Sequence, residues 1–135
     1  MAVTLKGITE DNFIDAFNLK LKKDQEEFVS HPIRSLAQAY VYRDQCQPFG
    51  IYEDDRMVGY MMVIYDYDVP EYDIWHMMID ETQQGKGYGK ALIDFLVRTY
   101  TGQYTALQVG TGDSPSTIPF YESCGFRRHH LVKKF

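Results

Sequence analysis

The sequence predicts one α/β domain of 135 residues, in which helices flank a mixed, mostly antiparallel sheet. Three observations lead to this fold class. Short apolar segments separated by turns fill the middle of the chain, a long segment with helical periodicity follows, and a glycine-rich turn at residues 85–89 joins the two. A chain of this length can bury a core without disulfides or metals, so residues 1–135 are expected to form a single domain.

The first third of the chain predicts one strand and two helices. Residues 2–8 indicate a short strand, and Thr9 is a candidate N-cap for a helix that runs to about residue 19. A second helix is expected to begin at residues 30–32, because Pro32 suits the first turn of a helix. Apolar residues at helical spacing in this second segment are Ile33, Leu36, Ala37 and Tyr40.

The middle of the chain predicts a hairpin, a further strand and a long helix. Residues 49–52 and 57–65 form the hairpin around a polar turn, and residues 71–79 form the next strand. The helix spans residues 88–100. Its expected buried face consists of Leu92, Phe95, Leu96 and Thr99, widened by Ile93 and Val97.

The last third predicts a strand at residues 104–109, a short helix that Asp113 or Ser114 begins, and a final strand at residues 126–135. Because a hairpin precedes the glycine-rich turn, the sheet is antiparallel in its first half. This arrangement differs from the parallel, doubly wound sheet of nucleotide-binding folds.

Composition excludes several classes of protein. The formal net charge of −5 argues against nucleic acid as a partner. No apolar run approaches 18 residues and the start of the chain lacks a signal-peptide pattern, so neither a membrane span nor secretion is expected. The two cysteines, Cys46 and Cys124, lie far apart without metal-binding spacing, which favours free thiols in the cytoplasm and no metal.

Acidic residues are concentrated between residues 53 and 81. This block carries −8, so the rest of the chain carries +3. It could be the solvated surface of hairpin loops, or an electrostatic funnel that attracts a cationic substrate. Its members are Glu53, Asp54, Asp55, Asp66, Asp68, Glu71, Asp73, Asp80 and Glu81, with Arg56 as the single basic residue.

The glycine-rich turn predicts a phosphate-binding site. Its glycines alternate along the chain, and the free amides and dipole of the following helix attract anions. Two common phosphate motifs do not fit. The dinucleotide fingerprint fails because the sixth position from Gly85 is Lys90, and the P-loop fails because Ala91 follows Gly89-Lys90.

Two motifs carry a resemblance to the GNAT superfamily of N-acetyltransferases. Residues 84–89 read Gln-Gly-Lys-Gly-Tyr-Gly and resemble the family's acetyl-CoA-binding motif, Gln-x-x-Gly-x-Gly. Residues 120–126 are similar to its Tyr-x-x-x-Gly-Phe signature. Residues 74–80 and 28–40 resemble bacterial members described as diamine, spermidine or spermine acetyltransferases. The resemblance implies a GNAT fold, in which the central strands splay apart.

The resemblance also implies an activity. Acetyl-CoA is the expected cosubstrate, and the acetyl group passes to a primary amine of a small cationic substrate, such as a polyamine or diamine, by direct attack on the thioester. Two alternatives stay open: another acceptor (an amino acid, an aminoglycoside or a protein amine), and a non-catalytic acyl-CoA-binding or regulatory module. A homodimer would fit the family. Similar proteins carry one more strand, which this domain is expected to lack.

The resemblance assigns roles around the cofactor. The backbone of Met78 and Ile79 is expected to pair with the pantetheine arm, and one of their N–H groups to stabilise the oxyanion. Tyr121 is the expected acid for the thiolate. Ser114 stands where the family often has Asn. The expected cofactor-binding residues are Met78, Ile79, Gln84, Gly85, Lys86, Gly87, Tyr88, Gly89, Lys90, Ser114 and Tyr121.

The base that accepts the proton of the amine is less defined. The candidates are Asp73, Glu71, His76 and Tyr40. Side chains alternate along a strand, so one of Trp75 and His76 is expected to face the substrate. The expected catalytic residues are Tyr121, His76 and Asp73, and the expected substrate contacts are Tyr40, Trp75 and Glu71.

Overall fold

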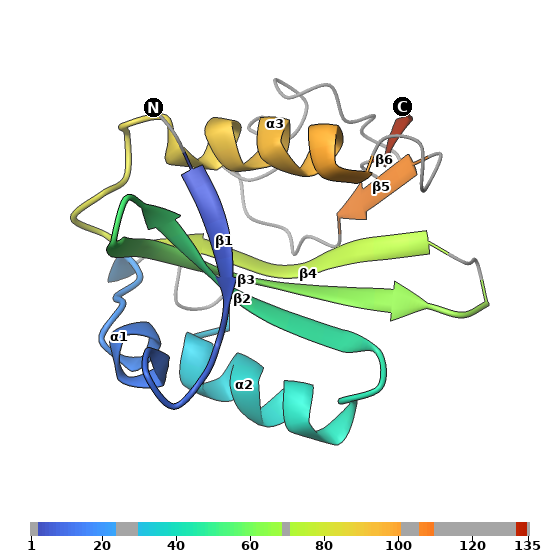
Figure 1. Cartoon of the computed structure of the whole chain (residues 1–135), viewed down its shortest axis with the longest axis horizontal. Coiled ribbons are helices and arrows are strands. Elements are labelled where there is room, and N and C mark those ends of the chain that lie inside the picture. The colour runs from blue at the N-terminus through green and yellow to red at the C-terminus, as the bar shows by residue number, and fades with distance from the viewer. Residues whose placement is uncertain (1–2, 24–29, 69–70, 101–105, 110–131, 135) are drawn as a thin grey trace.

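A computed structural model describes residues 3–23, 30–68, 71–100, 106–109 and 132–134. In this part of the chain six strands form one sheet in sequential order, with all neighbours antiparallel except β4 and β5, which are parallel. Helices α1 and α2 cover one face of the sheet and α3 covers the other (Figure 1). The elements are β1 (Val3–Gly7), α1 (Phe13–Phe17), α2 (Pro32–Val41), β2 (Cys46–Glu53), β3 (Arg56–Asp66), β4 (Glu71–Ile79), α3 (Tyr88–Tyr100), β5 (Ala106–Val109) and β6 (Val132–Lys134).

Helix α1 is shorter than the sequence predicts, because a hydrogen-bonded turn occupies residues 9–12. The Asn12 Oδ1 atom accepts from the Thr9 N–H at 2.8 Å, and the Thr9 hydroxyl accepts from the Asp11 N–H at 3.2 Å. These side chains satisfy backbone groups outside a helix, as Asx and Ser/Thr turns do. The helix therefore begins only at Phe13.

Helix α2 begins where it was predicted, but of its expected apolar residues only Leu36 packs against the cluster beneath the helix. The His31 ring caps it by accepting from the Ile33 N–H at 3.1 Å. Ser35 and Ala39 pack toward the sheet, whereas Tyr40 on the predicted apolar face is 71% exposed. Small side chains on the inner face allow the helix to lie close to the strands, which the larger residues would prevent.

Two apolar clusters pack on opposite faces of the sheet. From Tyr60 to Ile64, consecutive residues of β3 alternate between them, as the pleat of a strand requires. The cluster beneath α3 contains Val58, Met61, Val63, Ile74, Leu92, Ile93 and Leu96, and the cluster beneath α1 and α2 contains Ala16, Leu19, Ala39, Tyr60, Met62 and Met78.

A bulge interrupts the alternation of β4. Met62 pairs with His76 and Val63 pairs with Ile74, so Trp75 is an extra residue in the register. As a result Trp75 packs against the α1/α2 cluster and His76 contacts α2, so both rings lie on the same face of the sheet. The prediction that only one of them faces that side is therefore wrong. A bulge depends on tertiary pairing and leaves no local mark in the sequence.

The acidic block divides between the two ends of the β3–β4 hairpin. Glu53 pairs with Arg56 at the end near the glycine-rich turn, whereas Asp66 pairs with Glu71 at the other end. A nine-residue strand separates these ends by about 25 Å. The residues of the block therefore lie at two separate places along the backbone, and all nine do not line a single funnel.

Candidate active site

The turn between β4 and α3 has the backbone geometry of an anion site. Gly85 and Gly87 have φ angles of +78° and +88°, which side-chain-bearing residues rarely adopt. The Ala91 N–H makes an i→i−4 bond to the Gly87 carbonyl at 3.1 Å. The amides of Tyr88, Gly89 and Lys90 come before it and have no intrahelical partner, so they can bind phosphate oxygens.

Polar side chains fix this turn to its surroundings. The Gln84 Nε2 atom donates to the Ile79 carbonyl at 2.9 Å, which holds the turn against the end of β4. Asp80 accepts from the Lys20 N–H at 2.8 Å and from the N–H and hydroxyl of Thr82. Burial alone would raise the pKa of Asp80, but these hydrogen bonds outweigh burial and lower it. Asp80 therefore stays ionised and connects the turn to the segment after α1.

The side chain of Tyr88 faces the core instead of the turn. It is 4% exposed among residues that α3 packs against the sheet, and its hydroxyl accepts from Arg56 at 3.3 Å. A hydrogen bond with Glu53 raises the pKa of its phenol, although Arg56 opposes this shift. Only the backbone of Tyr88 is therefore placed for a cofactor. Lys86 and Lys90 are exposed beside the turn.

Backbone direction differs between the two expected cofactor contacts on β4. The Asp80 N–H donates to the Val58 carbonyl at 2.9 Å, and the Met78 carbonyl faces Gly59, so residues 78 and 80 direct their backbone groups at β3. Because these directions alternate along a strand, Ile79 directs its backbone groups away from β3.

Strand β4 is parallel to β5 on the side away from β3. The described register runs from Tyr72 opposite Leu107 to Ile74 opposite Val109, where the described part of β5 ends. Strand β4 itself continues to Ile79, whose carbonyl accepts from Gln84 on the glycine-rich turn.

On the α2 side of β4, a buried polar network holds His76. The fully buried Ser35 hydroxyl lies 2.7 Å from His76 Nδ1 and 2.8 Å from the Tyr60 hydroxyl. Burial, together with the positive charge of Arg34, lowers the pKa of His76 to about 4. Burial also raises the pKa of Tyr60 to about 12. Near neutral pH, then, His76 is an uncharged imidazole that can accept a proton.

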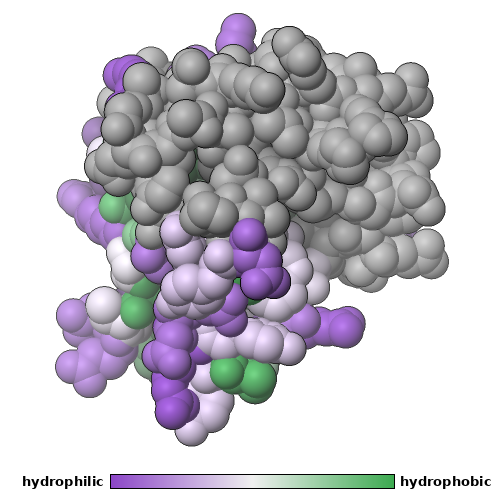
Figure 2. All heavy atoms as spheres, turned by 90° about the vertical axis from the view of Figure 1, so that its right-hand side faces the viewer, coloured by the Kyte–Doolittle hydropathy of each residue, from purple (hydrophilic) through white to green (hydrophobic). Residues whose placement is uncertain are grey.

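Aromatic and acidic side chains surround this imidazole on the same strand. The Trp75 ring stacks on His76 with centroids 4.9 Å apart, and the Tyr42 ring meets Trp75 edge-on at 5.9 Å. Asp73 is half-buried and pairs with Ile64, which packs against the α1/α2 cluster, so Asp73 faces the same side. Figure 2 views the molecule from the C-terminal end of α2, and the described side chains on this side are mostly hydrophilic.

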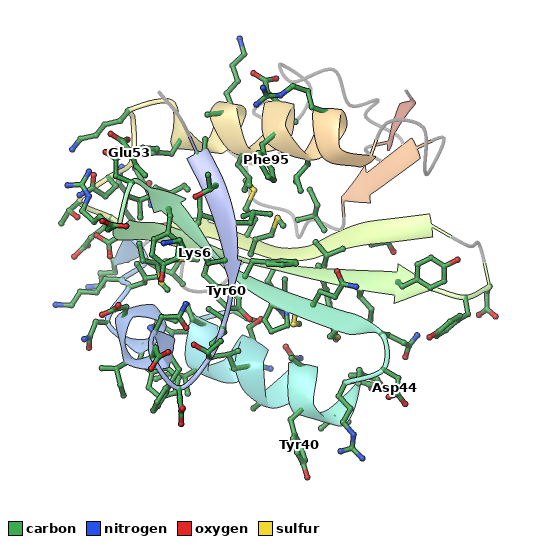
Figure 3. All side chains as sticks on the ribbon, viewed as in Figure 1. Lys6, Tyr40, Asp44, Glu53, Tyr60 and Phe95 are labelled. Atoms are coloured by element: carbon green, nitrogen blue, oxygen red, sulfur yellow. The ribbon has the colours of Figure 1, made fainter. Side chains whose placement is uncertain are left out.

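The structure brings together only some of the predicted site residues. Tyr40 points away from the sheet on the outer side of α2, next to Arg43, so it does not join the β4 residues (Figure 3). Glu71 begins β4 opposite Asp66. Ser114 and Tyr121 lie outside the described residues. Sequence reasoning missed the buried polar contact of His76 with Ser35 on α2, and that of Ser35 with Tyr60 on β3. The signal for Ser35 would have been a polar residue on an inner helix face.

The described part of the chain also bears on membrane, metal and thiol chemistry. None of its helices is long and apolar enough to cross a membrane. Within those same residues, no three His, Cys, Asp or Glu side chains are grouped to hold a metal ion. Cys46 is a buried free thiol, and burial raises its pKa, so it is a poor nucleophile.

The low pKa of His76 predicts a pH-dependent stability. An unfolded chain takes up this proton below about pH 6.5, whereas the folded protein takes it up only near pH 4. The contribution of the uncharged His76 to the free energy of unfolding is therefore complete above pH 6.5 and is lost as the pH falls toward 4. His76→Asn removes the titration, so urea unfolding should show a stability difference that changes by on the order of 1 kcal/mol over this range, since partial exposure reduces the effect. Parallel curves for both proteins would contradict the assignment.

Comparison with known proteins agrees with this geometry. The family described as "Acetyltransferase (GNAT) family" matches residues 11–126. A spermine/spermidine N(1)-acetyltransferase of Bacillus subtilis (strain 168) is 24% identical over 139 residues, which cover 94% of this chain and 89% of the relative. An IAA acetyltransferase from Bacillus cereus ATCC 14579 has 25% identity and a TM-score of 0.64, over 93% of this chain and 77% of its own.

A second solved structure shares the fold at lower identity. It is a spermidine N-acetyltransferase from Vibrio cholerae in complex with CoA and spermine, with 18% identity and a TM-score of 0.69. The match covers 98% of this chain and 92% of that one. The family match spans most of the chain, and the parallel pairing of β4 with β5 and the positive-φ glycine turn agree with it. This chain therefore belongs to the GNAT family of acetyltransferases.

Proposed function

We propose that this enzyme transfers the acetyl group of acetyl-CoA to a primary amine of a diamine or polyamine. The observation that carries the proposal is the arrangement of β4. This strand leads from the glycine-rich turn to His76, and an uncharged imidazole, an aromatic ring and a carboxylate share its α2 face. Relatives named for spermine and spermidine acetylation support the choice of amine.

The cofactor would lie beside β4 and the glycine-rich turn. The amides at the start of α3 bind the pyrophosphate, and the backbone of Ile79 pairs with the pantetheine arm as an added strand would. The Ile79 N–H is the proposed donor to the oxyanion.

Proton transfer would involve two groups, a base for the amine and an acid for the thiolate. As the neutral amine nitrogen bonds to the acetyl carbon, it passes one proton to His76 Nε2. The carbon–sulfur bond then breaks, and Tyr121, assigned by its motif and outside the described residues, protonates the thiolate. Solvent returns a proton to Tyr121 and removes one from His76. With a pKa near 4, His76 is about as basic as an ordinary carboxylate.

A second ammonium group of the substrate would bind near Asp73 and Trp75. Asp73 precedes His76 by three residues on the same face, so about two residue rises, roughly 7 Å, separate them. A carboxylate and the face of an indole ring both attract an alkylammonium ion. This spacing suits the few methylene groups between the nitrogens of diamines and polyamines.

Asp73→Asn tests the substrate class. We expect kcat/KM for spermidine and short diamines to fall by about tenfold, because the charge attraction to the second ammonium is lost. A monoamine of equal length should lose little. Acetylated product measured by mass spectrometry across a series of chain lengths gives both values.

The control for this variant is Asp55→Asn. Asp55 is an exposed acidic residue at the opposite end of the hairpin, 3.9 Å from Lys6, and its replacement changes the net charge equally. We expect no selective loss for diamines in the control. Equal losses for diamines and monoamines in Asp73→Asn would contradict the proposed second cation site.

A further inference from the structure

Three hydroxyl or sulfur groups meet beneath α2 at a point next to His76. The Ser35 oxygen lies 2.7 Å from His76 Nδ1, 2.8 Å from the Tyr60 oxygen and 3.6 Å from Met62 Sδ. The Tyr60 oxygen is 4.0 Å from the same sulfur. Ser35, Tyr60 and Met62 are each fully buried, so water cannot satisfy their polar atoms and the network must be internally complete.

The hydrogens of this network can be counted. A hydroxyl has one hydrogen and two acceptor lone pairs, and a thioether sulfur only accepts. If His76 carries its hydrogen on Nδ1, then Nδ1–H and the Tyr60 hydroxyl both donate to Ser35, and Ser35 donates to Met62. Every donor then has an acceptor. In the other tautomer Ser35 donates to Nδ1, and the Nε2–H of the half-buried ring has no acceptor among the described residues.

We propose that Ser35 is a positioning residue that, with Met62 as the acceptor of its hydrogen, holds His76 in the tautomer with a lone pair on Nε2. That lone pair faces away from the network. It is the atom that can accept the amine proton, so the inference rests on the proposed function. The network contains no carboxylate, and Arg34 is nearby, so it orients the ring without stabilising its charged form.

The tautomer is measured directly by nitrogen-15 NMR of the imidazole in the protein without substrates. We expect the wild type to show hydrogen on Nδ1 of His76. Hydrogen on Nε2 would overturn the proposal. This readout does not depend on catalysis. If the protein acetylates no diamine or polyamine, the proposed function fails while the tautomer assignment is still decided.

Met62→Leu is the sharpest variant, because it removes the sulfur acceptor while it nearly conserves volume. We expect the Nε2–H tautomer to increase and kcat to fall by about tenfold, with the KM for acetyl-CoA retained. The matched control is Met61→Leu. Met61 is equally buried on the same strand but packs under α3, so neither tautomer nor kcat should change.

Variants at the two hydroxyls of the network, Ser35 and Tyr60, separate the positioning of His76 from the packing of the core. Ser35→Ala should lower kcat by at least as much as Met62→Leu, and Ser35→Thr should restore part of it, because only the hydroxyl is common to Ser and Thr. The kcat of Tyr60→Phe is compared with that of Tyr52→Phe, a control that removes a buried hydroxyl bonded to Asn12 and outside the network. An unchanged His76 tautomer in both Ser35→Ala and Met62→Leu would overturn the proposal.

Discussion

Replacing His76 with asparagine should lower kcat by about 100-fold or more, which is the usual contribution of a positioned acid or base. Asparagine is suited to this test because its amide can occupy the place of Nδ1 and keep the contact with Ser35, while Nε2 is lost. The fold and the network should therefore persist. Because the proposed cofactor contacts on the glycine-rich turn and on Ile79 are untouched, the affinity for acetyl-CoA should change by less than about twofold, as expected for an independent site.

Steady-state kinetics with spermidine and calorimetry with acetyl-CoA check both parts of this prediction. Turnover near that of the wild type, in protein with unchanged stability, would contradict His76 as the proton acceptor. Asp73, on the same face of β4, would then be the next residue to test. A loss of acetyl-CoA binding equal to the loss of turnover would instead indicate that the variant has disturbed β4.

Gly59→Ala should be the most damaging conservative change in the described part of the sheet. A methyl group on Gly59 would overlap the Met78 carbonyl and would lie 2.9 Å from Ile79 Cδ1 and 3.2 Å from Ile51 Cδ1. A backbone carbonyl cannot move aside as the end of a side chain can. We expect a loss of about 3 kcal/mol in the free energy of unfolding and about 10 °C in Tm.

The same substitution should weaken acetyl-CoA binding, because the overlap displaces the backbone of β4 next to Ile79. Gly7→Ala is the matched control, since a methyl group on Gly7 at the end of β1 would meet no atom within 4 Å. Thermal unfolding of both variants measures the difference. Equal stability for Gly59→Ala and Gly7→Ala would mean that β3 and β4 are not packed as closely as this structure shows.

Local patterns predicted the elements well where one residue type decides the outcome. The bounds of β4 and α3 agree with the sequence, since an apolar run and three alternating glycines leave few alternatives. Helix α2 begins at its predicted proline. Its buried face was mispredicted because Ser35 and Ala39 have little apolar surface, and close packing against the sheet favours them over Tyr40.

The glycine-rich turn of the candidate site was predictable from the sequence, whereas the arrangement around His76 was not. Gly85 and Gly87 have positive φ angles, which glycines in a turn can indicate from the sequence alone. The side that Trp75 and His76 face depends on a bulge in the pairing with β3, and the backbone direction of Ile79 depends on the same register. Contacts between Ser35 and His76 join residues 41 positions apart, and only the folded structure reveals them.

The most direct test of the account is CoA release from acetyl-CoA, followed with a thiol-reactive dye, in the presence of single amines. The panel contains spermidine, spermine, short diamines, monoamines of equal length, amino acids and an aminoglycoside. The account predicts saturable release with diamines and polyamines, with a kcat/KM well above that for the monoamines. Release with an amino acid or aminoglycoside alone would contradict the proposed substrate, and no release with any amine by folded protein would contradict the proposed activity.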